Sequence, residues 1–156
     1  MIRRLIIAAA LALSPAAAED GGAAWKRCTA CHLADGKGIP GAFPRLAGRL
    51  HDAALSDAGR AYLILTVTAG VMGPIEVDGK TIRGIMPAQA GLTDADVAAV
   101  LNHASALPGP DGKAPAPVKP FTAEEVASVK AAHPGATPNA VHAARAGVAF
   151  EAGAKP

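Results

Sequence analysis

Aromatic side chains are scarce in this 156-residue chain, which contains one Trp, one Tyr and three Phe. Apolar residues make up 51% of the sequence, and alanine dominates them. Aromatic rings bring the largest buried areas of any side chain. A core built almost entirely from Ala, Val, Leu and Ile is therefore thin for a single domain of this length. We expect something other than side chains to fill part of the interior.

Two further absences exclude classes of protein. The chain has no run rich in Lys and Arg, which argues against a nucleic-acid partner. It has 17 Gly and 13 Pro but no G-X-Y period, so it is loop-rich and not collagen-like. Its one long apolar run lies near the N-terminus and is shorter than the ~20 residues that span a bilayer.

Residues 1–18 have the three parts of a secretory signal. Arg3 and Arg4 form a positive start, residues 5–13 are apolar, and the alanines at 16–18 offer a cleavage site. An uncleaved N-terminal anchor is the alternative. Without this segment, 13 basic and 13 acidic residues remain, so the mature chain is formally neutral. We expect export to a bacterial periplasm, an oxidising compartment, without stable insertion in the membrane.

The two cysteines lie in the sequence Cys28-Thr29-Ala30-Cys31-His32. This is C-x-x-C-H, the attachment signature of c-type haem. Residues three apart lie on one face of a helix, so both thiols can reach the two vinyl groups on one edge of a haem. His32 then provides the proximal ligand of the iron. The motif predicts one covalently bound haem c, whose bulk would fill the interior that lacks aromatic rings.

Three other interpretations of the cysteines are weaker. A thioredoxin-type redox pair would follow a strand in a βαβ unit, and no strand-like run precedes Cys28. A zinc site needs about four ligands, and Cys28, Cys31 and His32 are too crowded for a closed site without a second cysteine pair. A structural disulfide would leave His32 as an ordinary surface residue.

An electron-transfer haem usually takes a second strong axial ligand. Met86 precedes Pro87, which disfavours helix at Met86, so an extended segment can direct its thioether to the iron. Met72 is the rival, and we interpret it as a side chain that fills a gap in the core. The remaining candidates are the histidines at 51, 103, 133 and 142. We interpret His103 as a surface or capping residue, and we expect His133 and His142 to face solvent.

Residues 25–106 resemble a class I cytochrome c domain, the small, mostly helical monohaem type. The resemblance rests on the order of five motifs, which are C-x-x-C-H, GAFPRLAG at 41–48, GPIEVDGK at 73–80, MPA at 86–88 and LTDADVAAVL at 92–101. It implies an all-α, cytochrome c-like fold around one covalent haem. Pro44 matches the proline whose carbonyl accepts the Nδ1–H of the proximal histidine. Met86 matches the distal ligand.

The resemblance also implies roles for residues around the haem. Leu46 is expected to pack on the haem face. Arg45 is expected to pair with a haem propionate, a charge-assisted contact, with a solvated loop arginine as the alternative. Trp25 is expected to be a core ring near the haem edge.

The chain divides into four predicted parts, which are a signal peptide (1–18), a cytochrome c domain (19–106), a Pro/Gly-rich linker (107–120) and a short helical C-terminal extension (121–156). Within the domain we expect helices over 19–32, 51–69 and 93–106, the last capped by Thr93. Turn signals at 73–74 and 78–79 predict a short hairpin within 71–84. Thr122 and Glu125 predict a capping box that opens a short helix ending before Pro134. A second short helix is expected to start near residue 137 and to run towards Phe150.

These features predict an electron-transfer protein rather than an enzyme. The expected partners are a periplasmic dehydrogenase as electron donor and an oxidase or another cytochrome as acceptor, with this chain a separate carrier or the dehydrogenase's cytochrome subunit. Thioether ligation raises the potential of the iron. The alternative is a haem c enzyme, or a gas or peroxide sensor, with an open distal site.

Overall fold

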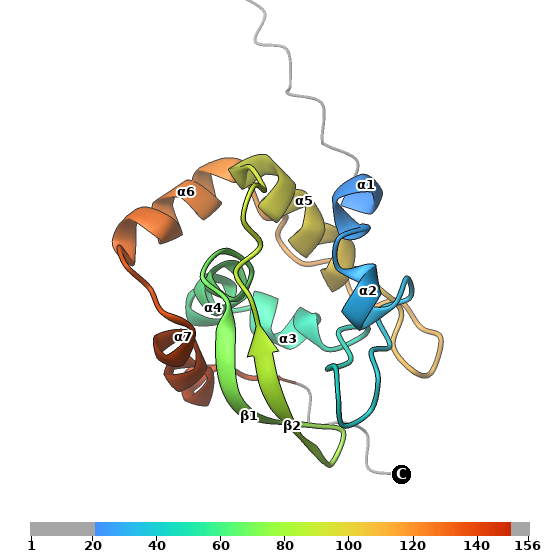
Figure 1. Ribbon diagram of the computed structural model, residues 1–156. Coiled ribbons are helices and arrows are strands. Elements are labelled where there is room, and N and C mark those ends of the chain that lie inside the picture. Colours follow the sequence, from blue (N-terminus) through green and yellow to red (C-terminus); the bar gives the residue numbers. More distant parts are fainter. Residues whose placement is uncertain (1–20, 151–156) are drawn as a thin grey trace, which may run out of the picture.

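The computed structural model describes residues 21–150, so the predicted signal peptide lies outside the described residues (Figure 1). The described residues begin with two short helices, α1 (Gly21–Trp25) and α2 (Thr29–His32). The predicted continuous helix over 19–32 is therefore wrong. Between the helices, each backbone N–H donates to the carbonyl three residues earlier in the chain. The Thr29 hydroxyl also donates to the Lys26 carbonyl, at 2.9 Å. This tight turn reorients the chain just before the C-x-x-C-H motif.

The predicted helix over 51–69 is two helices, α3 (Leu50–Ala54) and α4 (Asp57–Thr68). Ser56 caps α4 by accepting a hydrogen bond from the Gly59 N–H at 3.1 Å, and a helix that starts at a cap cannot continue from the one before. The apolar spacing that predicts one helix includes Leu55, which lies at the break and is 65% exposed. The other members of that spacing, Tyr62, Leu63 and Val67, are buried.

A two-stranded antiparallel hairpin follows, formed by β1 (Val71–Val77) and β2 (Lys80–Met86). Asp78 and Gly79 both have positive φ, at 51° and 71°, as a two-residue type I′ turn requires. The turn predicted at Gly73–Pro74 is wrong, because both residues pair with β2. Proline is tolerated in an edge strand, where its missing N–H breaks no ladder bond.

The last helix of the predicted domain is α5 (Asp94–Ser105), and its Thr93 cap is present as a full capping box with Asp96. α5 lies between α1 and α6 (Ala123–Ala132), as Figure 1 shows. The chain then forms α7 (Pro138–Ala144) and a 3-10 turn (Arg145–Gly147). The described residues include no helix long and apolar enough to cross a membrane.

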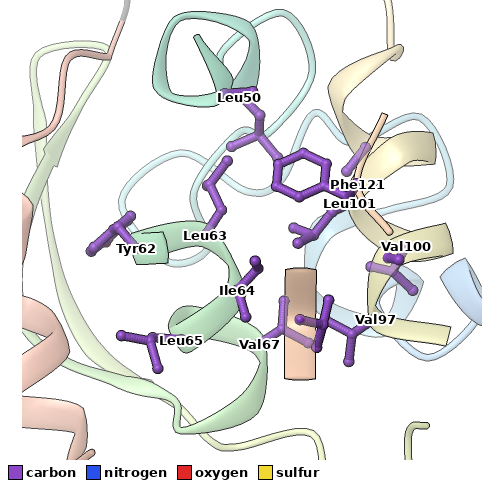
Figure 2. Close-up of a cluster of buried hydrophobic side chains, with 14 of the residues drawn as sticks. Leu50, Tyr62, Leu63, Ile64, Leu65, Val67, Val97, Val100, Leu101 and Phe121 are labelled. Atoms are coloured by element: carbon purple, nitrogen blue, oxygen red, sulfur yellow. The ribbon is translucent and has the colours of Figure 1, made fainter. Parts of the chain in front are cut away.

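One hydrophobic cluster joins these elements. Figure 2 shows side chains of α3, α4 and α5 converging with Phe121. Val126 of α6 and Val141 of α7 belong to the same cluster. Two short helices bury little on their own, so the sequence predicts that they pack either on the cytochrome c domain or on a partner; they pack on this chain's own cluster.

α6 is fixed by an ion pair that the sequence did not predict. Thr122 accepts from the Glu125 N–H as expected, but the Glu125 carboxylate is bonded by Arg60 of α4, at 2.6 Å from both Nε and Nη2. The Arg60 guanidinium also lies 3.8 Å from the centre of the Phe121 ring. α6 is thus held to α4 by charge as well as by apolar contacts.

α7 lies against β1. The Nε2–H of His142 donates to the Pro74 carbonyl at 2.7 Å, and its ring occupies the space that a side chain at Gly73 would need. The prediction that His142 faces solvent is wrong, because this ring is half-buried against the strand. His133 is exposed, as expected.

Candidate haem site

α2 positions the cysteine motif at the wall of a cavity. Cys28 and Cys31 are half-buried, and His32 is buried. The Nδ1–H of His32 donates to the Pro44 carbonyl at 3.0 Å. Because Nδ1 carries the proton, Nε2 keeps a free lone pair. Burial lowers the pKa of His32, although the bond to Pro44 acts in the opposite direction. A neutral imidazole is the form that binds a metal.

The cavity has a volume of about 700 Å³. Its walls come from α2, the loop of residues 41–49, α4, both strands of the hairpin, α5 and the C-terminal extension. The structure brings every predicted site residue together, because all of them line the cavity: Cys28, Cys31, His32, Pro44, Arg45, Leu46 and Met86. Trp25 also lines it, with its indole N–H donating to the Ala34 carbonyl at 3.0 Å.

The hairpin register separates the two methionines. Met86 is paired with Val71, whose side chain lines the cavity, and Met86 lines it too. Met72 is the next residue on β1, so its side chain points to the other face of the strand. It is 36% exposed, and its expected role as a filler of the core is wrong. Among the described residues that line the cavity, Met86 is the one methionine and His32 the one histidine.

The remaining histidines have other contacts. His51 lies 3.0 Å from the carboxylate of Asp52. His103 stacks against Trp25 with ring centres 5.3 Å apart. The Nδ1–H of His133 donates to the Val129 carbonyl at 2.9 Å. None of them lines the cavity.

Arginine side chains gather at one end of the cavity. Arg45 makes two hydrogen bonds to Asp78, each of 2.8 Å, and its side chain is only 10% exposed. The alternative of a solvated loop arginine is therefore wrong. Arg49 is more deeply buried and lies 3.8 Å from the same carboxylate. Arg45 lowers the pKa of Asp78 by bonding its ionised form.

The C-terminal extension contributes a third arginine, which the sequence did not predict. Arg145 donates to the Tyr62 hydroxyl at 3.2 Å and lies 4.2 Å from the centre of the Phe150 ring. Burial lowers the pKa of Arg49, and the charge of Arg145 lowers it further. Arg145 is about a hundred residues from the loop that it approaches, and no local pattern marks it.

The residues around the cavity fit a haem. Its volume lies within the ~300–1,000 Å³ of ligand pockets, and its walls are mostly apolar. Three guanidinium groups and the carboxylate of Asp78 give its edge a positive balance, which suits the two propionates of a haem. Burial raises the pKa of the Cys28 thiol. Redox-active cysteines have lowered pKa values, so the site does not favour thiol exchange.

A C-x-x-C-H helix, a histidine fixed through Nδ1 and a methionine on the same cavity define the class of covalent haem proteins. The sequence model of the family described as "Cytochrome c" matches residues 18–108. Two relatives from Thermus thermophilus, both named cytochrome c-552, are also similar. One is 45% identical over 115 residues, covering 74% of this chain and 77% of that protein. The other is 46% identical over 112 residues, covering 72% of this chain and 85% of that protein.

The chain belongs to the cytochrome c family. It is a class I, monohaem c-type cytochrome with a mostly helical fold, and its cofactor is one covalently bound haem c. It is an electron carrier and therefore has redox partners. The family, fold class and cofactor predicted from the sequence are confirmed.

Proposed function

We propose that the chain carries single electrons with His32 and Met86 as the two axial ligands and with Cys28 and Cys31 as the thioether attachments. The observation that carries this proposal is the presence of all four side chains on the walls of one cavity. When bound, the haem supplies the Fe(III)/Fe(II) couple. Thioether ligation favours Fe(II) and raises the potential.

The protein's own groups prepare the site for this couple. The Pro44 carbonyl fixes the ring of His32 and raises its basicity as a ligand. Leu46 and the apolar side chains of α4 exclude water from the cavity. The arginines hold the propionates, and Arg45 is itself oriented by Asp78.

The ligand assignment is tested with two matched substitutions. Met86→Ala is expected to give a high-spin iron and to abolish the charge-transfer band of Met–Fe(III) in the oxidised spectrum. Met72→Ala is the control and should leave the band unchanged, because Met72 lies outside the cavity. The reverse result contradicts the assignment. Haem that is lost on acid-acetone extraction would contradict the thioether attachments.

An open distal site is the second candidate function. It predicts a high-spin spectrum in the unsubstituted protein and spectral changes on addition of CO or peroxide. The position of Met86 on the cavity wall favours the six-coordinate carrier instead. A high-spin spectrum that responds to CO would replace the carrier with an enzyme or sensor.

We further propose that the chain is exported to the periplasm and accepts electrons from a dehydrogenase there, as a separate carrier or as its cytochrome subunit. A respiratory oxidase or another cytochrome is the acceptor. The signal-like residues 1–18 support export. The purified protein is expected to begin at Glu19, whereas retention of residues 1–18 in the membrane fraction would support an anchor.

The donor is tested with the products of neighbouring genes. An adjacent dehydrogenase is expected to reduce the oxidised holoprotein directly in stopped-flow mixing. Failure of this reduction, while a small-molecule reductant still reduces the haem, contradicts the dehydrogenase role and leaves the ligand assignment intact.

We also propose the division into a cytochrome c domain (19–106), a linker (107–120) and an extension (121–156). Residues 107–120 form no helix or strand, which supports these bounds. Because the extension supplies Arg145 to the cavity, it is expected to act within this chain. Removal of the extension should change the haem spectrum as well as the stability.

A further inference from the structure

The C-terminal extension contacts the hairpin that carries Met86. His142 of α7 is half-buried, and its Nε2–H donates to the Pro74 carbonyl at 2.7 Å. A Cβ atom on Gly73 would lie 2.6 Å from Cγ and Cδ2 of the His142 ring and 2.7 Å from its Cε1. Because these three ring atoms are at nearly equal distances, the ring lies with its face against Gly73. α7 is therefore fixed to the middle of β1 by one hydrogen bond and one close contact.

Gly73 is suited to this contact because it has no side chain. Its φ is 148°, a conformation that residues with a Cβ atom rarely adopt. Gly73 also lines the cavity, whereas His142 does not. His142 can therefore act on the site only through the strand that it contacts.

The hairpin register connects this contact to Met86. Gly73 pairs with Gly84, and Val71 pairs with Met86 two residues further along the two strands. The pairing continues without a break to the turn, so the two strands are expected to move as one unit. Gly84 and Ile85 are exposed, and a Cβ atom on Gly84 would meet nothing within 4 Å. The residues just before Met86 thus depend for their position on β1 and on the contacts that hold β1.

Other hydrogen bonds hold the two ends of the hairpin. Arg45 bonds Asp78 at the turn, and the Gln89 N–H donates to the Val67 carbonyl at 2.9 Å just after β2. His142 holds the middle of the hairpin, from the C-terminal extension. Figure 1 shows β1 between α7 and β2. A force that moves β2 away from the cavity is therefore resisted through β1 by α7.

We infer that His142 is a positioning residue for Met86: it fixes β1, and β1 holds the paired strand so that the thioether stays on the iron. This inference rests on the proposed ligation by Met86. A ligand from solution binds the iron only when Met86 leaves it. Leaving requires β2 to shift, and the contact of His142 with the hairpin opposes that shift. Loss of the contact lets the site open more often, which raises the apparent affinity for an added ligand.

Imidazole binding to the oxidised holoprotein measures this opening. Bound imidazole replaces the methionine and removes the Met–Fe(III) band, so a titration of the band at constant pH gives the apparent dissociation constant of imidazole. His142→Ala should lower that constant about fivefold, the factor that corresponds to one ordinary hydrogen bond. His142→Gln places an N–H near the position of Nε2 and should stay close to the unsubstituted protein.

Two controls separate positioning from a general loss of stability. His133→Ala removes an exposed histidine of the same extension and should leave the dissociation constant of imidazole unchanged. Glu125→Gln removes the ion pair that holds α6 to α4, so it should lower the free energy of unfolding without changing that constant. If His142→Ala gives no folded holoprotein, His142→Phe should lower the constant instead, because it keeps a ring against Gly73 and removes the donor.

An unchanged dissociation constant in His142→Ala and His142→Phe, with the Met–Fe(III) band present in the unsubstituted protein, overturns the inference and leaves the ligation by Met86 intact. An equal fall of the constant in Glu125→Gln also overturns it, because the effect would then follow from general loosening of the extension. Absence of the band from the unsubstituted protein contradicts the ligation by Met86 itself, and the inference falls with it.

Discussion

Three arginine side chains and one carboxylate gather at one end of the cavity, which leaves an excess of positive charge there. Arg45 and Arg49 share the carboxylate of Asp78, and Arg145 contacts a hydroxyl and an aromatic face. Burial lowers the pKa of Arg49, and the charges of Arg145 and Arg45 lower it further, so the cationic form of Arg49 is disfavoured without a further anion. In the proposed site, the two propionates of the haem would restore the balance of charge at this end of the cavity.

Arg145→Gln is expected to lower the midpoint potential. Removal of one partly buried positive charge stabilises Fe(III), and a change of about 1 kcal/mol corresponds to about 40 mV for a one-electron couple. A potentiometric titration of the oxidised protein measures it. Arg83→Gln removes the same charge from an exposed side chain on the cavity rim and should shift the potential less, because solvent screens it. Equal shifts would contradict a specific role for Arg145.

The features that could be predicted from the sequence are those defined by a few neighbouring residues. The C-x-x-C-H spacing, the Thr93 cap and the Asp78–Gly79 turn are each defined within a few residues. Which of Met72 and Met86 lines the cavity was also predictable, because the type I′ turn fixes the register and the alternation along β1 turns Met72 outward. The role of Arg145 could not be predicted, because it depends on contacts between distant segments.

At the level of elements, caps and ion pairs determine where helices start and how they dock. The break between α3 and α4 follows from the cap at Ser56, which outweighs the apolar spacing that suggested one helix. Glu125 was expected to complete a cap, but a buried arginine on another helix is a stronger partner for a carboxylate. Local patterns thus predicted the existence of α6 but not the contact that holds it.

Glu125→Gln is expected to destabilise the protein by about 3 kcal/mol, at the lower end of the range for loss of one partner of a buried pair. Three backbone carbonyls remain near the guanidinium of Arg60, which limits the cost. Denaturant unfolding of the holoprotein at pH 7 measures the difference. Glu124→Gln changes an exposed neighbour and should alter the stability little. Similar losses in both variants would show that the pair with Arg60 contributes nothing specific.

The ion pair between Arg60 and Glu125 makes the free energy of unfolding depend on pH. Hydrogen bonds from Arg60 lower the pKa of Glu125 below its ordinary value of 4.5. The pair therefore contributes fully above that value, and its contribution is lost as the pH falls through the lowered pKa of the folded state. The unsubstituted protein should lose more stability in this acidic range than Glu125→Gln does.

The whole molecule is organised around its cavity. Elements from both ends of the chain meet at it, and the hydrophobic cluster that surrounds it includes α6 and α7. The scarcity of aromatic residues predicted such a space, and the C-x-x-C-H motif predicted its occupant. The closure of the site by the C-terminal extension was not predictable, because the sequence shows only that two short helices need something to pack against.

The haem-free chain is expected to be poorly folded. Without haem, a cavity of about 700 Å³ with mostly apolar walls is left open to water, and apolar surface that stays exposed to water contributes nothing to folding. Typical domains are stable by only about 5–15 kcal/mol, and repulsion among the arginines adds to the loss. Cys28→Ala/Cys31→Ala protein, purified without haem, should show reduced helical circular dichroism and no cooperative thermal transition. A sharp, native-like melt would show that the polypeptide folds without its cofactor and that the cavity is filled in some other way.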